Sequence, residues 1–349
     1  MKRIKEIEGI RGIAALMVVF SHVLGCLPFA LMLANIDLAK TPIHILWDGH
    51  AAVIVFFVFS GYFASIKYFE FNIKMTTKEY FKYIYNRFLR IYPVYFIAIL
   101  IGFILCNMLY TRSNVEYFNE WFVKFWTNKL TIKEFINQIF IIGKFNTDLI
   151  NPPIWTMVYE MRIVIVLPIF IILMKKYNST LVLIASFVIS KLLPIIGVLH
   201  IFLMGMWIAK NQHIIIEKVN KRNIYKYILL IIGLVAFISR WTFYNIFSRF
   251  SIGKIDLVLL FGFACIFIYI LCSKGNRKNI LVNNKIFNFI GGISYSIYSI
   301  HFIVLLFLGK YYQYIDNYLL FVVLNLIITI ILATIINKTI EKKIIKYKL

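Results

Sequence analysis

Acidic residues are scarce in this chain of 349 residues, which has 15 Asp and Glu against 38 Lys and Arg. Charged residues of both signs make up only 15% of the sequence, whereas 61% of it is hydrophobic. An ordinary soluble domain carries about a quarter of charged residues, so this composition excludes one. The basic excess does not indicate a nucleic-acid-binding protein either, because apolar runs interrupt it and no continuous basic patch forms.

Cysteine is also rare, and its spacing excludes the common metal sites. None of the four residues forms a CxxC pair, and all lie in or beside apolar runs: Cys26, Cys106, Cys265 and Cys272. We expect ordinary apolar cysteines and no metal. We also expect no cleavable signal peptide, because the first apolar run lacks a small-residue cleavage site and contains His22. Internal repeats and low-complexity tracts are not visible.

Long apolar runs, by contrast, are abundant, and the mean hydropathy is +0.82. A helix of about 20 apolar residues crosses the hydrocarbon core of a bilayer. We therefore predict an all-α, polytopic membrane protein that forms one domain over residues 1–349, with a short cytoplasmic tail at 338–349 and no soluble domain. The ten predicted spans cover residues 10–29, 50–69, 88–109, 154–174, 179–195, 198–210, 224–243, 255–273, 289–309 and 317–337.

The distribution of basic residues predicts the orientation of these spans. Of the Lys and Arg residues outside the spans or at their ends, 25 fall on the side of the N-terminus and 11 on the opposite side. Basic loops stay in the cytoplasm, so we expect both termini there and an even number of spans. The longest outer segment, residues 110–153, contains Trp121 and Trp126, which suit an interfacial helix or a cap over a cavity.

One stretch of the first span, residues 9–22, combines an arginine with a histidine. Arg11 and His22 are eleven residues apart, close to three turns of helix. Both side chains therefore lie on one face, about 16 Å apart along the axis. One can hold an anion near the cytoplasmic surface, and the other can take a proton deeper inside. A simpler interpretation is that His22 only bonds to a neighbouring helix.

Polar residues inside other spans fall at a similar depth. Ser60, Glu160 and His301 each lie about 15–21 Å from a membrane surface, as His22 does. Buried polar groups of this kind face a cavity or a partner. We therefore predict that His22 and Glu160 line one cavity within direct or one-water reach, that His301 lies on the same wall, and that Arg11 opens from that cavity towards the cytoplasm.

Each of these residues also has a structural interpretation. Ser60 can form a close-packed pair with its neighbouring glycine, and Glu160 can pair with Arg162. His301 belongs to a polar stripe with Ser294 and Tyr298 that can be a packing seam. The remaining histidines lie in loops or at span ends, and we expect them to be structural: His44, His50, His200 and His213.

A second basic pair lies at the cytoplasmic boundary, in the sequence NRFLRIYP. Arg87 and Arg90 are three residues apart, so they share one helix face. They can anchor the span by the positive-inside rule. They can also form a phosphate clamp with Arg11, because guanidinium groups match phosphate oxygens better than ammonium groups do.

Five stretches together make the sequence, from about Lys5 to Asn337, resemble the membrane-bound acyltransferase-3 family. They are IEGIRGIAALMVVFSH, FFVFSGYF, RFLRIYPVYF, PPIWTMVYEMRIVIVLP and ISYSIYSIH. The first is the most specific, since the family pattern is a basic residue, ten others and then histidine. The family transfers acyl groups, often acetyl, to saccharides and other extracytoplasmic acceptors. We expect this protein to lie in the bacterial plasma membrane.

The resemblance implies roles for individual residues. His22 is expected to be the catalytic base, and Arg11, Arg87 and Arg90 are expected to bind acyl-CoA, most simply acetyl-CoA. Apart from the resemblance, a buried carboxylate can orient an imidazole as in a catalytic triad, and we expect Glu160 to do so. The expected substrate cavity includes Ser60, Trp155, Tyr159, Arg162, Tyr298 and His301.

The chain departs from the family pattern at one motif. Many members have WSLSxE, whereas here Trp155 and Glu160 persist, Val158 replaces the second serine and Arg162 adds a charge. Some members carry a further esterase-like domain, and because this sequence ends at Leu349, just past the tenth span, we expect none.

Two other classes of function remain open on the residues alone. A proton-coupled secondary transporter or a lipid or glycan flippase also uses buried His and Glu, although no two-fold repeat is visible. A non-catalytic membrane scaffold leaves the in-phase Arg11 and His22 unexplained.

Overall fold

The computed structural model describes residues 5–29, 31–33, 36–113, 116–273 and 284–347. Over these residues the chain is almost wholly helical, and the strands are the short antiparallel pair β1 (Met32–Leu33) and β2 (Ile36–Asp37). The predicted all-α membrane class is confirmed, and the described part holds no soluble domain. Six of the basic residues used for the orientation lie outside the described residues: Lys2, Arg3, Lys274, Arg277, Lys278 and Lys348.

The α-helices fall into a long group and a short group. The long ones are α1 (Lys5–Gly25), α2 (Gly49–Glu70), α3 (Thr77–Leu109), α6 (Trp155–Lys176), α8 (Leu199–Asn220), α9 (Asn223–Thr242), α11 (Ile252–Cys272), α13 (Ser294–Lys310) and α14 (Tyr318–Ile336). The shorter ones are α4 (Glu120–Val123), α5 (Ile132–Ile139), α7 (Ser179–Leu192), α10 (Tyr244–Phe247), α12 (Lys285–Gly292) and α15 (Lys342–Ile345). The four cysteines are buried and unpaired, as expected.

The number of membrane-crossing helices is somewhat lower than the ten predicted. Seven helices of the described chain are long and apolar enough to cross, and α12 with α13 makes an eighth if the bent pair is one span. The predicted spans at 179–195 and 198–210 correspond to α7, which has only 14 residues, and to α8, which has 22 but is less apolar.

Two span boundaries differ from the prediction in ways that matter for the site. Helix α1 covers Lys5–Gly25 rather than 10–29, so His22 lies only three residues from its outer end. The predicted span at 289–309 is broken by a bend of 76° between α12 and α13. The bend makes Ser294 the first residue of α13, where its side chain can face α1.

Close helix packing depends on glycine at a few crossings. A Cβ atom at Gly205 of α8 would collide with the carbonyl oxygen of Val58 in α2, and one at Gly61 would collide with the carbonyl oxygen of Phe202. The crossing of α1 with α12 uses Gly12 in the same way. Small residues let helix backbones approach closely in membranes, where dispersion rather than hydrophobic burial drives association.

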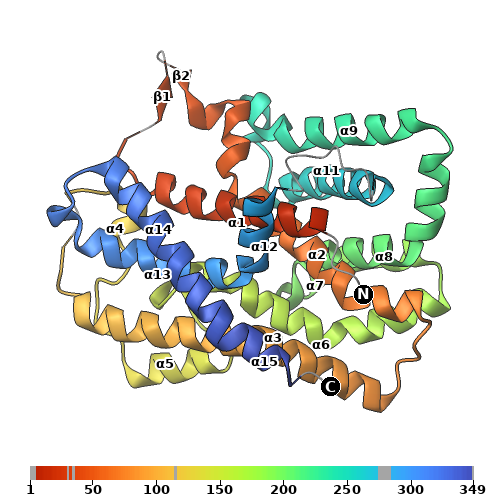
Figure 1. The fold of residues 1–349 in the computed structure, drawn as a ribbon, viewed down its shortest axis with the longest axis horizontal. Coiled ribbons are helices and arrows are strands. Elements are labelled where there is room, and N and C mark those ends of the chain that lie inside the picture. The colour runs from red at the N-terminus through yellow and green to blue at the C-terminus, as the bar shows by residue number, and fades with distance from the viewer. Residues whose placement is uncertain (1–4, 30, 34–35, 114–115, 274–283, 348–349) are drawn as a thin grey trace.

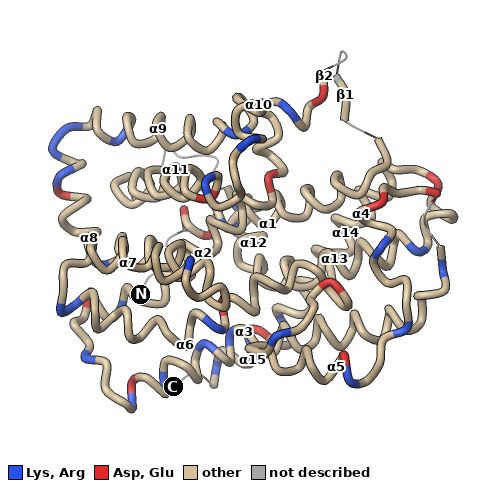
Figure 2. Tube along the Cα trace, turned by 180° about the vertical axis from the view of Figure 1, so that it is seen from behind, with Lys and Arg blue, Asp and Glu red and all other residues tan. Residues whose placement is uncertain are grey.

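Helices α1 and α2 lie in the middle of the bundle, with α9 and α11 on one side and α3, α5 and α6 on the other (Figure 1). Lysines and arginines gather at the α8–α9 turn and near α3, α6 and α15 (Figure 2). Many large apolar side chains of α7, α9 and α14 are exposed, among them Leu181, Ile231 and Ile331, as expected of helices that face lipid.

Candidate active site

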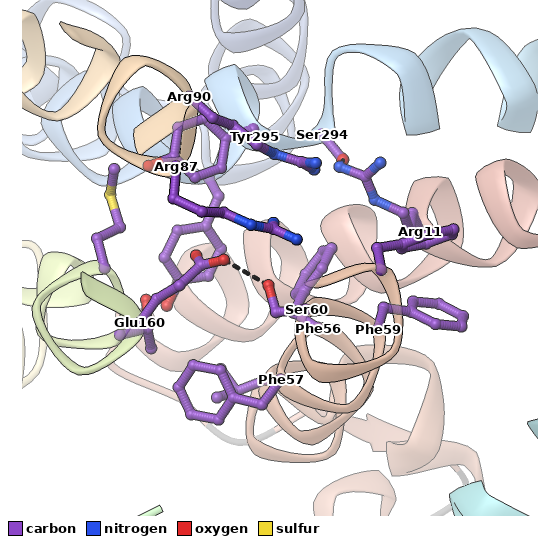
Figure 3. A pocket seen from close by; sticks show the side chains of 15 residues that line it. Arg11, Phe56, Phe57, Phe59, Ser60, Arg87, Arg90, Glu160, Ser294 and Tyr295 are labelled. Carbon is purple, nitrogen blue, oxygen red and sulfur yellow. Dashed lines mark hydrogen bonds between the residues drawn. The ribbon is translucent and has the colours of Figure 1, made fainter. Parts of the chain in front are cut away.

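Three arginines from two helices converge on one cavity, which we call the arginine cavity. Arg11 enters from α1, and Arg87 and Arg90 enter from α3 (Figure 3). The predicted grouping of these three guanidinium groups is therefore observed. The other walls come from α2, α6 and α13 and include Ser60, Glu160, Ser294, Tyr295 and Tyr298.

Hydrogen bonds hold two sides of the arginine cavity. Arg11 donates from Nη2 to Ser294 Oγ at 2.9 Å, which joins α1 to α13 just after the bend. Ser60 Oγ donates to a carboxylate oxygen of Glu160, and Arg87 points between this pair and Arg90 (Figure 3). Three guanidinium groups against the single carboxylate of Glu160 leave the described lining positive, which suits a phosphate.

A second cavity adjoins the arginine cavity along the same helices, and we call it the histidine cavity. Its lining includes Ser21 and His22 of α1, His50 and Val53 of α2, Trp121 of α4, Asp148, Trp155 of α6 and Tyr298 of α13. The Trp121 indole stacks on the imidazole of His22, with ring centroids 6.1 Å apart and planes 16° apart. The outer segment therefore covers this cavity, as the aromatic residues in it predicted.

His22 and His301 are in contact across α1 and α13. His301 Nε2 lies 3.1 Å from His22 Nδ1, and His22 Nδ1 also lies 3.0 Å from the carbonyl oxygen of Val18. His301 Nδ1 faces the carbonyl oxygen of Tyr298 at 2.8 Å. His301, which we expected on the cavity wall beside His22, is buried and contacts the His22 ring.

For neutral rings, these contacts assign the tautomers of both histidines. Since His301 Nδ1 faces carbonyl oxygens, it carries the hydrogen, and its Nε2 is an acceptor. His22 Nδ1 then donates towards His301 Nε2 and Val18 O. The remaining nitrogen, His22 Nε2, is left with its lone pair. An imidazole held in this tautomer, on a cavity wall, can accept a proton from a bound molecule.

The expected pairing of His22 with Glu160 is wrong. Glu160 accepts from Ser60 in the arginine cavity, whereas His22 contacts His301 in the histidine cavity. Depth does not separate the two residues, since His22 is three residues from the C-terminal end of α1 and Glu160 is five residues from the start of α6. The physical reason is that the two side chains lie on helix faces that line different cavities.

Two further residues expected in the cavity face elsewhere. The Tyr159 hydroxyl donates to the carbonyl oxygen of Pro194 at 3.1 Å, and Arg162 donates to the carbonyl oxygens of Ile142 and Gly143. Among the described residues, the side chains of α6 that do line the two cavities are Trp155, Thr156, Met157 and Glu160. Positions 159 and 162 share a different helix face, so Arg162 does not pair with Glu160 either.

The sequence analysis missed His50. Its Nε2 is bonded to a carboxylate oxygen of Asp256 on α11, and its ring lines the histidine cavity. The other three histidines expected to be structural do not line either cavity in the described lining. His50 is the second residue of α2, so it lies close to one end of that helix. His22 lies at a similar depth, but this follows only from the observed end of α1 at Gly25 and not from the predicted span.

The two cavities lie one above the other along α1, α2, α6 and α13. Val53 and Tyr298 line both of them. The arginines thus lie on one side of Val53 and Tyr298, and His22 lies on the other. On α1 the two groups are eleven residues, or about 16 Å, apart, as the spacing predicted.

Comparison with known proteins gives one match. A family model described as an acyltransferase domain, of the acyltransferase-3 type, matches residues 4–338. No match was found among curated proteins or among solved structures.

Proposed function

The chain belongs to the acyltransferase-3 family of membrane acyltransferases, and on this premise we propose that it moves an acyl group from cytoplasmic acyl-CoA to a hydroxyl of an extracytoplasmic saccharide or glycolipid. The acyl group is acetyl in the simplest case. His22 is the general base. The observation that carries this proposal is the contact of His22 Nδ1 with His301 Nε2 and with the carbonyl oxygen of Val18, because in a neutral ring it leaves Nε2 of this cavity-lining residue free to accept a proton.

The arginine cavity supplies the donor site. Arg11, Arg87 and Arg90 bind phosphate oxygens of CoA near the cytoplasmic side, where guanidinium groups give bidentate, charge-assisted hydrogen bonds. The thin pantetheine arm then extends along α1, and its length is comparable to the 16 Å between Arg11 and His22. Ser60 and Glu160 hold the far side of this cavity, so Glu160 acts on Arg87 and not on the base.

The histidine cavity supplies the acceptor site. Trp121 and Trp155 present large aromatic faces, and His50 with Asp256 adds a polar pair that can bond to acceptor hydroxyls. The two cavities have similar volumes, about 720 Å³ here and about 660 Å³ in the arginine cavity.

The reaction needs no net proton exchange with water. His22 Nε2 takes the proton of the acceptor hydroxyl as its oxygen attacks the thioester carbonyl carbon. The carbon–oxygen bond forms, the carbon–sulfur bond breaks, and the same proton passes to the departing thiolate. His301 stabilises the imidazolium by accepting from His22 Nδ1, in the role that a carboxylate has in a catalytic triad.

We also propose the bacterial plasma membrane as the location, with both termini cytoplasmic. The support is the excess of basic residues on the N-terminal side and the family membership. This orientation places the arginine cavity towards the CoA pool and the histidine cavity towards the outside.

The test is direct transfer of label. Purified protein is incubated with acetyl-CoA labelled in the acetyl group and with glycans extracted from the cell envelope. Label that enters the glycan and depends on the protein supports the proposal. If label stays in acetyl-CoA, while the protein dissipates a proton gradient in vesicles, the transporter alternative replaces it.

A further inference from the structure

The two cavities adjoin at one level of the bundle, where they share two lining residues. On α2, Val53 lines both cavities and Ser60 only the arginine cavity; on α13, Tyr298 lines both and Ser294 only the arginine cavity. On α6 the change occurs between Trp155, which lines the histidine cavity, and Thr156, which lines the arginine cavity. We call Val53 and Tyr298 the neck.

The neck is tightly held. Both side chains are 8% exposed. The Tyr298 hydroxyl donates to the carbonyl oxygen of Pro153 at 3.1 Å, and its ring packs edge-on against Phe56 with centroids 6.0 Å apart. Pro152 and Pro153 open a short 3-10 helix before α6, and their fixed φ angles limit movement of that carbonyl. Tyr298 therefore cannot swing aside without losing its hydrogen bond.

From this geometry, and resting on the proposed function, we infer that the neck selects the acyl group by size. A thioester that enters from the arginine cavity and presents its carbonyl to His22 must place its alkyl chain at the level of Val53 and Tyr298. An acetyl methyl is small enough for such a constriction. A hexanoyl chain adds four methylenes, and extra methylenes in a packed site force side chains and backbone apart. The neck thus favours acetyl and other short acyl groups.

Val53 is the position at which this inference can be tested in both directions. Val53→Ala removes two methyl groups from the neck and widens it, whereas Val53→Leu adds one carbon and narrows it. One methylene in an apolar pocket changes discrimination about 10- to 200-fold, so a shift of about tenfold or more is expected. The matched control is Val58→Ala, because Val58 is a fully buried valine of the same helix that packs against α8 and lines neither cavity.

The experiment uses the full chain in inverted membrane vesicles, with labelled acetyl-CoA and labelled hexanoyl-CoA as separate donors. The measured quantity is the ratio of kcat/KM for hexanoyl transfer to that for acetyl transfer into the glycan and lipid fraction. We expect a wild-type ratio below one tenth, a rise of about tenfold or more in Val53→Ala, a fall in Val53→Leu and no change in Val58→Ala.

The outcomes separate this inference from the function on which it rests. If the wild type transfers acetyl but the ratio does not move in Val53→Ala and Val53→Leu, the neck does not select the acyl group, and the proposed function stands. If the wild type transfers hexanoyl faster than acetyl, the neck likewise does not select short acyl groups, and the proposed function stands. If the wild type transfers neither group, the proposed function and this inference fall together. If size-exclusion chromatography shows that Val53→Ala does not fold, Val53→Leu decides the test. A lower hexanoyl-to-acetyl ratio in Val53→Leu supports the inference, and an unchanged ratio contradicts it.

Discussion

His301 Nε2 lies 3.1 Å from Nδ1 of His22, although the two residues are 279 positions apart in the chain. The contact joins the first helix to α13, and it fixes which nitrogen of His22 carries a hydrogen. The conclusions about catalysis follow from this pair, because it leaves the second nitrogen of His22 able to accept a proton in a cavity that adjoins the three arginines.

The first prediction concerns His301 as a positioning residue. His301→Ala removes the ring that accepts from His22 Nδ1, so the tautomer is no longer fixed and kcat should fall about tenfold or more. The KM for acyl-CoA should change little, since His301 does not line the arginine cavity in the described lining. His301→Gln retains an acceptor oxygen and should recover part of the lost rate. A higher KM with an unchanged kcat would mean that His301 serves donor binding instead.

The second prediction concerns the donor site. Arg90→Ala and Arg11→Ala should raise the KM for acyl-CoA more than the KM for the acceptor, because they remove binding shared by ground and transition states. Arg90→Lys should restore only part of the affinity if the contact with phosphate is bidentate. Steady-state kinetics with each substrate varied in turn measures both effects. Full recovery in Arg90→Lys would indicate a simple membrane anchor.

The third prediction separates Glu160 from the base. Glu160→Gln keeps the size of the side chain and an acceptor for Ser60 Oγ, but it removes the charge beside Arg87. The KM for acyl-CoA should change about two- to tenfold, which corresponds to roughly 0.4–1.4 kcal/mol, and kcat should change by no more than about tenfold. A fall in kcat of a hundredfold or more would mean that Glu160 takes part in catalysis after all.

The fourth prediction concerns the crossing of α2 and α8. Gly205→Ala places a methyl group against the carbonyl oxygen of Val58, so the helices must separate. Such overpacking costs about 1–3 kcal/mol. Gly253→Ala, near the start of α11, is the control, because no atom lies within 4 Å of the added carbon. Unfolding by SDS titration in mild detergent compares the free energies of unfolding. Equal stability of the two variants would refute the close crossing.

Local patterns in the sequence predicted a large part of the fold and some of the site. Apolar runs of about 20 residues predicted most of the helices, and helical periodicity predicted that Arg11 and His22 share a face and that Arg87 and Arg90 share another. These inferences need only the geometry of a single helix, which does not depend on tertiary packing.

Contacts between helices were predicted less well, because they depend on how each helix is rotated and packed as well as on depth. Glu160 was expected beside His22 from depth alone, whereas the two side chains line different cavities. The bend before Ser294 was not predicted, although it positions the hydroxyl that accepts from Arg11. His50 was considered structural, since its partner Asp256 is 206 residues away and no local pattern connects them.

The most direct measurement is the rate of acetyl transfer by the His22→Ala variant, compared with the wild type at equal amounts of folded protein. Labelled acetyl-CoA is supplied to inverted vesicles, and label in the glycan and lipid fraction is counted over time. Loss of a general base costs about 10²–10⁴ in rate, so transfer by His22→Ala should fall at least a hundredfold while binding of acyl-CoA persists. A rate close to that of the wild type would contradict the assignment of His22 as the base.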